Sequence, residues 1–423
     1  MNYPVYCLRF DRTGRYFITG ADDFLLKVFY LGAGQSFLVC TLRGHAGVIN
    51  DIDVSWDNCF LATASDDGDV RVWGLKTGCP IAILRGHKGG ANMVSCQREE
   101  YNKTAPGQFV FNDLIDEGVK LLSKYQHGSI QEEHHGPGTR SRRGAINVIC
   151  VARCPLGKQF VTGSDDAIWI ESKPLLKLMG HVSTITDLAY SNAGDRILSA
   201  SQSDGVVRLW NIGIAALAGS GDKSVFKDKR VTQIVIKLTN PFSKQPSQPT
   251  RRRKGSAARN ASSKPGSQFL CLWDSKSGQC LIGISGAHTL NCQVVIPHPM
   301  DASIFCTGSI DGTVKVWDWT QGKCIFSHRN KVELGPPDPK KPSFAGYLDG
   351  SFSPDGSAIV LTDECGQITV LDSISKEDNP PNSGNSLKWM REQYFANDYY
   401  DLAYDRNGYC IERGSGRPPH LAP

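Results

Sequence analysis

The feature that most constrains this 423-residue chain is a recurring order of four short apolar runs between one Gly-His pair and the next. The clearest copy lies between His45 and His87, and turn residues such as those at 66–68 separate its runs. Gly supplies positive φ and Asp bonds its own backbone, so these clusters end strands. The apolar–polar alternation at 70–72 has the period of two expected of a half-buried strand. The pattern therefore predicts an all-β chain.

The same order recurs along the chain with varying completeness. An apolar fraction of 40% and a charged fraction of 21% are ordinary for a folded protein, and the net charge of +5 permits an acidic partner without requiring one. Counting the repeats gives seven or eight. Their expected starts are near Val5, Ile49, Val148, Ile185, Val231, Cys292 and Tyr347, with one altered after His87.

Four strands repeated every ~40–45 residues, with Gly-His early and Trp late, resemble a WD repeat. This resemblance implies a β-propeller of seven or eight blades, some degenerate or incomplete, with disordered insertions and a non-globular C-terminal tail. The expected parts are propeller at 1–96, 145–212 and 267–372, a divergent insertion or altered blade at 97–144, a low-complexity basic insertion with one strand at 213–266, and a C-terminal extension at 373–423.

The 213–266 insertion is rich in Pro, Ser and basic residues. Such a composition cannot bury enough apolar area to offset the entropy of ordering, so we expect disorder there. The insertion also contains a basic run, which is either a nuclear-import signal or a solvated linker. This run consists of Arg251, Arg252, Arg253 and Lys254.

The WD resemblance also implies a structural tetrad in the complete repeats. It is a hydrogen-bond chain from a Trp N–H through Ser and His to Asp, which satisfies buried polar groups. Two full sets and one partial set are expected. They are His45, Ser65, Asp67 and Trp73; His288, Ser309, Asp311 and Trp317; and His181, Asp204 and Trp210, where Gln202 stands in the place expected for Ser.

Three other motifs carry a chemical alternative. The Ser, His and Asp of a tetrad could be a catalytic triad, but recurrence in several repeats favours a scaffold. The acidic and His residues at 132–135 could bind a metal, although a solvated loop is favoured. The segment 219–224 resembles a phosphate loop, but Asp222 stands where Gly should precede Lys223. We therefore expect no enzymatic activity, no metal and no cofactor.

Several segments resemble the bromodomain and WD-repeat-containing protein family more closely than WD proteins at large. The C-terminal segments lie outside the propeller pattern, so they distinguish this family. The matching residues are Val5–Cys7, Phe10–Gly14, Thr19–Asp23, Lys27–Val28, Thr41–His45, Glu392–Phe395, Asp398–Tyr399, Arg406 and Pro419–Leu421.

This family resemblance implies a nuclear, chromatin-associated protein that affects transcription, with links to cell shape and cytoskeleton organisation. Its partners would be proteins, including histones or other chromatin components. The family's bromodomains are absent from this chain, so acetyl-lysine binding is not assigned to it. Neither sequence-specific nucleic-acid binding nor membrane attachment is expected.

Two alternative functions stay open. Trp273, Asp274 and Lys276 loosely match the box by which WD receptors contact the adaptor of a cullin-type ubiquitin ligase. Lys276 replaces the Arg of that box and lacks its bidentate fork. The other alternative is a general cytoplasmic WD-repeat adaptor.

Overall fold

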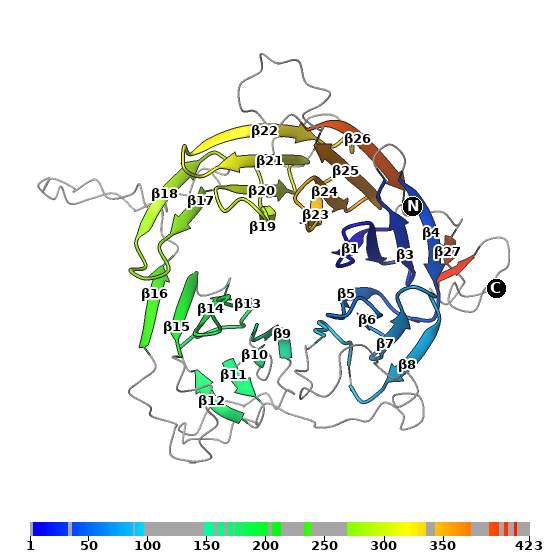
Figure 1. Cartoon of the computed structure of the whole chain (residues 1–423), viewed down its shortest axis with the longest axis horizontal. Coiled ribbons are helices and arrows are strands. Elements are labelled where there is room, and N and C mark those ends of the chain that lie inside the picture. The colour runs from blue at the N-terminus through cyan, green and yellow to red at the C-terminus, as the bar shows by residue number, and fades with distance from the viewer. Residues whose placement is uncertain are drawn as a thin grey trace, which may run out of the picture. The chain divides into compact units, whose positions relative to one another are not determined.

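The computed structural model describes residues 3–32, 36–87, 89–96, 148–155, 160–164, 168–171, 174–178, 180–201, 205–212, 232–237, 269–335, 343–373, 389–396, 402–404 and 410–412. All regular elements in these ranges are β-strands, arranged in antiparallel sheets (Figure 1). No helix in the described ranges could span a membrane. The all-β prediction is confirmed, and the four-stranded sheets fit the predicted propeller.

The chain divides into two compact units, Met1–Leu8 with Leu238–Tyr399, and Arg9–Lys237 with Tyr400–Pro423. In the first unit, each sheet follows chain order. Its strands are β17 (Phe269–Trp273) with β18 (Cys280–Ser285); β19 (Cys292–Pro297), β20 (Ile304–Ser309), β21 (Thr313–Asp318) and β22 (Lys323–Arg329); and β23 (Tyr347–Phe352), β24 (Ala358–Asp363), β25 (Gln367–Ser373) and β26 (Trp389–Ala396).

The remaining sheets also join strands that follow one another in the chain, as antiparallel hairpins allow. Their strands are β1 (Val5–Phe10), β2 (Tyr16–Ala21), β3 (Leu26–Tyr30) and β4 (Phe37–Leu42); β5 (Ile49–Val54), β6 (Phe60–Ser65), β7 (Val70–Gly74) and β8 (Pro80–Leu84); β9 (Val148–Arg153), β10 (Phe160–Ser164), β11 (Ile168–Glu171) and β12 (Pro174–Leu178); β13 (Asp187–Tyr190), β14 (Arg196–Ser201), β15 (Val206–Asn211) and β16 (Thr232–Lys237); and β27 (Leu402–Tyr404) with β28 (Cys410–Glu412).

Burial differs between the strands of a sheet. The second strands β6 and β24 are buried along almost their whole length, whereas the fourth strand β8 is largely exposed. A second strand is covered on both faces, so its polar side chains need partners inside the protein. This position is where the polar networks described below are anchored.

The C-terminal extension differs from the expected non-globular tail. Trp389–Ala396 forms β26 and pairs along β25, with Val370 opposite Gln393 and Ile368 opposite Phe395. The pairing explains why the segment lacks repeat signals. A fourth strand needs only backbone hydrogen bonds, so neither Gly-His nor Trp has to mark it.

The segment after His87, where the repeat pattern stops, is held by carboxylates of β5. The Val94 N–H donates to Asp51 at 3.0 Å, and the Cys96 N–H donates to Asp53 at 2.7 Å. Residues 97–147 lie outside the described residues, so the predicted insertion at 97–144 stays a prediction.

The turns between second and third strands require a left-handed residue. Gly312 has φ +73°, and a Cβ there would lie 2.5 Å from the Phe344 Cβ. Phe24 takes the corresponding position in the first sheet at φ 67° and is a non-Gly exception. Gly205 has φ +63°, with open space around the added Cβ.

Gly312→Ala should lower the free energy of unfolding by about 3 kcal/mol, because left-handed strain adds to a clash with Phe344. Gly205→Ala is the matched control and should cost only about 1 kcal/mol, from strain alone. Denaturant unfolding of both variants measures the difference. Equal losses of unfolding free energy in the two variants would show that the clash with Phe344 is relieved without cost.

Candidate functional site

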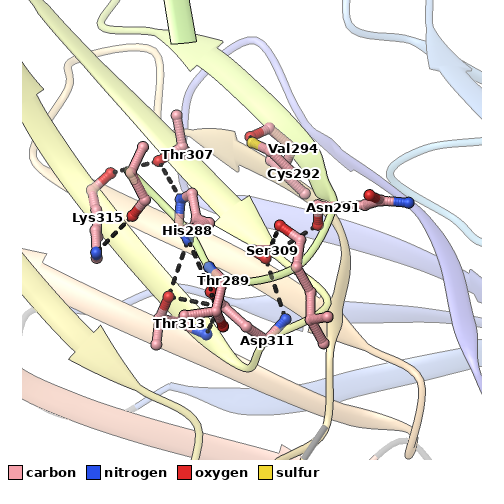
Figure 2. A network of polar contacts seen from close by, with 12 residues as sticks. His288, Thr289, Asn291, Cys292, Val294, Thr307, Ser309, Asp311, Thr313 and Lys315 are labelled. Carbon is pink, nitrogen blue, oxygen red and sulfur yellow. Dashed lines mark hydrogen bonds and ion pairs between the residues drawn. The ribbon is translucent and has the colours of Figure 1, made fainter. Parts of the chain in front are cut away.

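A buried hydroxyl in the β19–β22 sheet joins an indole to an imidazole. The Trp317 N–H donates to Thr307 Oγ1 at 2.8 Å. His288 Nε2 lies 2.8 Å from the same oxygen (Figure 2). Thr307 is fully buried and His288 is 1% exposed. Leaving any of these groups unpaired would cost free energy, so the hydroxyl is required for stability.

Asp311 holds the other side of His288. His288 Nδ1 lies 3.0 Å from Thr313 Oγ1 and 3.4 Å from Asp311 Oδ2, and the Thr313 hydroxyl donates to Asp311 Oδ1 at 2.6 Å. Burial alone would raise the pKa of Asp311. Hydrogen bonds from His288, Thr313 and Thr289 outweigh it and hold the pKa well below its ordinary value.

The β5–β8 sheet repeats this arrangement. The Trp73 N–H donates to Thr63 Oγ1 at 3.2 Å, Thr63 Oγ1 lies 2.7 Å from His45 Nε2, and His45 Nδ1 lies 2.9 Å from Asp67 Oδ2. Assigning the protons from these partners gives a neutral His45 with its proton on Nδ1. Burial lowers the pKa of His45, which agrees with that neutral state.

A third network lies in the β13–β16 sheet. Ser199 Oγ accepts the Trp210 N–H at 2.9 Å and lies 2.7 Å from His181 Nε2. Gln202 and Asp204 lie outside the described residues. The His and Trp positions are therefore brought together as expected in this sheet, while its Asp stays a prediction.

The prediction that Ser residues at the end of the second strand bridge Trp and His is wrong. The sequence predicts that Ser65 and Ser309 join Trp to His, but Thr63 and Thr307 do so. In the third network, Ser199 takes this role and the position of Gln202 does not. Ser65 instead accepts the Asp67 N–H at 3.2 Å. Residues two apart share a strand face, so periodicity could not choose between them. The strand register distinguishes them, because Thr63 pairs with Arg71, which lies two residues before Trp73.

A cation on the third strand was missed by the sequence analysis. Lys315 Nζ donates to the Ala287 carbonyl at 2.5 Å and lies 5.9 Å from the Trp317 ring centroid. Arg208 donates to the Gly180 carbonyl at 2.7 Å. The signal in the sequence is a basic residue two positions before Trp210 and Trp317, which donates to the carbonyl preceding His. In the case of Lys315 it also lies over the Trp ring.

The β1–β4 sheet has no Gly-His and uses a different polar pair. Lys27 Nζ lies 2.7 Å from Asp23 Oδ2, and both side chains are at most 1% exposed. Removing one partner of such a pair leaves a buried charge and costs about 3–5 kcal/mol. Lys27 therefore takes the place of the third-strand cation, two positions before Phe29, and gives Asp23 a buried partner.

In the β23–β26 sheet, a buried Asn330 takes part in the polar network. Its amide donates to Asp363 Oδ2 at 2.8 Å and to the Ala345 carbonyl at 3.0 Å. Burial raises the pKa of Asp363 despite these hydrogen bonds. No motif in the sequence predicts this role of Asn330.

Some of the remaining candidate residues lie in the part of the chain that the structure describes, and others lie outside it. Asp274 accepts the N–H groups of Lys276 and Ser277 at 3.0 and 3.1 Å, so it caps its own turn. The adaptor contact assigned to Trp273, Asp274 and Lys276 stays a prediction. Arg251–Lys254 and the segments 132–135 and 219–224 lie outside the described residues. Within the described ranges, no group of three or more metal-ligating side chains occurs.

The networks favour a structural role over catalysis. Thr63 and Ser65 are fully buried, and the Thr63 hydroxyl already bridges Trp73 and His45. A nucleophile must reach its substrate. These hydroxyls instead tie the second and third strands to the segment preceding the first strand.

The chain matches the family "WD domain, G-beta repeat" at residues 2–29, 36–74, 172–211 and 278–318. It is 28% identical to a bromodomain and WD repeat-containing protein of Dictyostelium discoideum over 99% of this chain and 21% of that protein. It is 26% identical to cell division control protein 4 of Saccharomyces cerevisiae, over 50% of this chain and 28% of that protein.

A further relative is a U3 small nucleolar RNA-associated protein 15 homolog of Xenopus tropicalis, which is 25% identical over 46% of this chain and 36% of that protein. The chain therefore spans about a fifth to a third of these relatives. The repeated networks and the repeat matches together show that the chain contains WD repeats, and its four-stranded sheets fit a β-propeller. Such repeats serve protein–protein interaction. The bromodomain and WD-repeat relative is similar along nearly the whole chain.

Thr307→Val should lower the free energy of unfolding by about 2–4 kcal/mol, because the Trp317 N–H and His288 Nε2 both lose their partner. Thr307→Ser keeps the hydroxyl and should lose less than about 2 kcal/mol. Hydrogen exchange of the Trp317 indole N–H provides the specific readout. It should accelerate in Thr307→Val and stay slow in Ser309→Ala; the reverse order would return the bridging role to Ser309.

Acidification should destabilise the protein through His45. Its pKa is lowered in the folded state, so the unfolded state binds more protons. The stability is fully present above the ordinary His pKa of about 6.5 and falls as the pH drops below that value. Urea unfolding between about pH 7.5 and 5.5 should show this loss. His45→Gln should reduce this pH dependence of the free energy of unfolding, whereas substitution of the exposed His87 should not.

Proposed function

We propose that this chain is the WD-repeat part of a chromatin-associated transcription regulator that also affects cell shape and cytoskeleton organisation. It acts in the nucleus as a non-enzymatic scaffold for proteins, including histones or other chromatin components. The observation that carries the proposal is the alignment with a bromodomain and WD repeat-containing protein over 99% of the chain. This alignment extends beyond residue 318, where the last matched repeat ends.

The structure supports a scaffold role through rigid sheets that hold exposed loops. His181 is fixed by Ser199, and the next residue, Val182, is 87% exposed. Trp56, in the turn between β5 and β6, is 54% exposed. Loops held by a rigid framework are common binding elements, and exposed apolar side chains supply contact area for a protein partner.

The proposed nuclear location rests on the names of the relatives and on a sequence motif. One relative is named for association with a small nucleolar RNA. The basic run Arg251–Lys254 supplies a candidate import signal. These features support a nuclear rather than a cytoplasmic adaptor.

The proposal predicts that the tagged full chain accumulates in nuclei and sediments with chromatin. Replacing Arg251–Lys254 with Ala should lower the nuclear-to-cytoplasmic ratio at least about threefold, because import receptors bind clustered positive charge. Replacing Arg140, Arg142 and Arg143 with Ala is the matched control and should not. Fluorescence microscopy and nuclear fractionation measure both effects.

Crosslinking mass spectrometry of the chromatin-bound chain should then identify histones or histone-associated proteins. A chain that stays cytoplasmic, or that enters nuclei without chromatin partners, would contradict the proposal. Recovery of a cullin adaptor, lost in Lys276→Ala, would instead favour the ubiquitin-ligase function.

A further inference from the structure

Three aromatic side chains form a row across strands β2, β3 and β4. Tyr16 pairs with Tyr30 on the next strand, and Tyr30 pairs with Phe37 on the strand after it. The ring centroids of Tyr16 and Tyr30 are 5.5 Å apart, and those of Tyr30 and Phe37 are 5.3 Å apart. Directly paired residues project from the same face of a sheet, so the three rings form one continuous strip.

This row lies at the surface, whereas the aromatic pair one residue further along the strands is internal. Phe17 and Phe29 stack across β2 and β3 on the opposite face, and both are fully buried. In the row, Phe37 is 51% exposed and Tyr16 is 36% exposed. The row therefore lies beyond the buried part of the sheet, where it meets solvent or a partner.

The β5–β8 sheet places a fourth exposed ring at the same end. The Arg12 N–H donates to Asn58 Oδ1 at 2.8 Å, and the Asn58 amide donates to Asp11 Oδ2 at 3.1 Å. These bonds join the turn that precedes Tyr16 to the turn that carries Trp56. The Trp56 side chain is 54% exposed, so it extends the aromatic surface onto the second sheet.

The turn that carries Trp56 is fixed by its own hydrogen bonds. Asp57 Oδ1 accepts the Ser55 hydroxyl at 2.5 Å and the Cys59 N–H at 3.1 Å. The Asn58 N–H also donates to the Ser55 carbonyl at 3.1 Å. Little conformational entropy is lost when a partner covers a side chain on a turn that is already ordered.

The β7–β8 turn, which carries Lys76, lies on the face of the first sheet from which the row projects. A Cβ at Gly78 would lie 3.9 Å from Cys40 Sγ. Cys40 pairs with Val28, which lies two residues before Tyr30 and therefore shares its strand face. Lys76 thus places a positive charge on the aromatic side of the sheet.

The exposed charges at this end of the two sheets are mostly positive. The turns concerned are residues 11–15, 31–36, 55–59 and 75–79. Among their described residues, the exposed charged side chains are Arg12, Arg15, Lys76 and Asp57. Asp11 is 2% exposed and does not contribute. A partner of complementary charge is therefore acidic.

Aromatic rings beside cations also occur in sites for single-stranded nucleic acid. Nucleic-acid sites commonly contact about 6–10 phosphates, which is more than the few cations here can neutralise. The Arg12 guanidinium, moreover, already donates to the Val54 carbonyl at 2.7 Å. The ring planes of Tyr16 and Tyr30 meet at 65°, so they do not offer parallel faces to successive bases. These observations favour a protein partner.

We propose that the aromatic end surface, formed by Tyr16, Tyr30, Phe37 and Trp56 with the exposed cations beside them, binds an acidic segment of a partner protein that also carries large apolar side chains. The apolar side chains cover the rings, and the carboxylates lie against the cations. Trp, Tyr and Arg are the residue types that contribute most to binding at protein interfaces. The surface does not depend on the nuclear role proposed above.

The direct test titrates the full chain with short synthetic peptides. The probe peptide alternates Asp and Glu with Phe and Leu. One control peptide replaces every acidic residue with Lys, and another replaces every apolar residue with Ser. Calorimetry should show that both controls bind at least about tenfold more weakly than the probe. Failure of the probe to bind, or equal affinity for the Lys peptide, would overturn the proposal.

Two variants separate the apolar and electrostatic contributions. Phe37→Ser should weaken probe binding about tenfold, because an exposed ring at the centre of the contact is lost. Lys76→Glu should weaken it about fivefold and reduce its dependence on salt concentration. Met300→Ser is the matched control, since Met300 is 75% exposed on a turn of another sheet, and it should leave the affinity unchanged.

If Phe37→Ser lowers the stability of the first sheet, Lys76→Glu still decides the question, because Lys76 is an exposed residue of a turn. Unchanged probe affinity and salt dependence in Lys76→Glu would contradict the proposal. Hydrogen exchange gives the location. The probe should slow exchange of the amides at 37–40 and 56–59, and protection confined to other segments would also contradict it.

Two further measurements test the other occupants. Tighter binding of oligothymidine or oligouridine than of the probe peptide would assign the surface to nucleic acid. Self-association of the chain in sedimentation velocity that Phe37→Ser abolishes would assign it to a second copy. Either result would overturn the proposal, which predicts weak oligonucleotide binding and a sedimentation coefficient unaffected by Phe37→Ser.

Discussion

A buried hydroxyl shared by an indole and an imidazole is the interaction on which the complete repeats depend. Thr63, Ser199 and Thr307 each lie on a second strand, inside the sheet and away from water. At that depth an unpaired donor is costly, so each network is stable only when all its members are present. The same hydroxyl ties the third strand to the segment before the first strand. The second strand thereby connects the third strand to the start of the repeat.

The incomplete repeats keep the requirement for satisfied burial and change the chemistry. The first sheet buries Lys27 against Asp23, and the last described four-stranded sheet buries Asn330 against Asp363. A charged pair and an amide–carboxyl pair are different solutions to one constraint, since buried polar groups need partners. Degeneracy in the motif is therefore not loss of the network.

Because their polar groups bond to one another inside the sheets, the networks contribute stability and position rather than chemistry. Exposed apolar side chains such as Val182 leave surface available for the protein partner proposed above. Repeat proteins separate these tasks, because each unit is stabilised by its own contacts and those of its neighbours. This separation is consistent with similarity to relatives of different names, since loops can change while the networks are retained.

The sequence alone determined the all-β class, the positions of most strands, and the His and Trp residues of three networks. Apolar alternation, turn residues and a fixed Gly-His to Trp order are local signals, and local signals survive without tertiary information. Tertiary structure decided which hydroxyl bridges Trp and His, because Thr63 and Ser65 share one strand face and only strand register separates them. It also decided that β26 belongs to a sheet and that Lys27 pairs with Asp23 in the first sheet. The bridging hydroxyl and the place of β26 depend on the register between paired strands, which residue type does not encode.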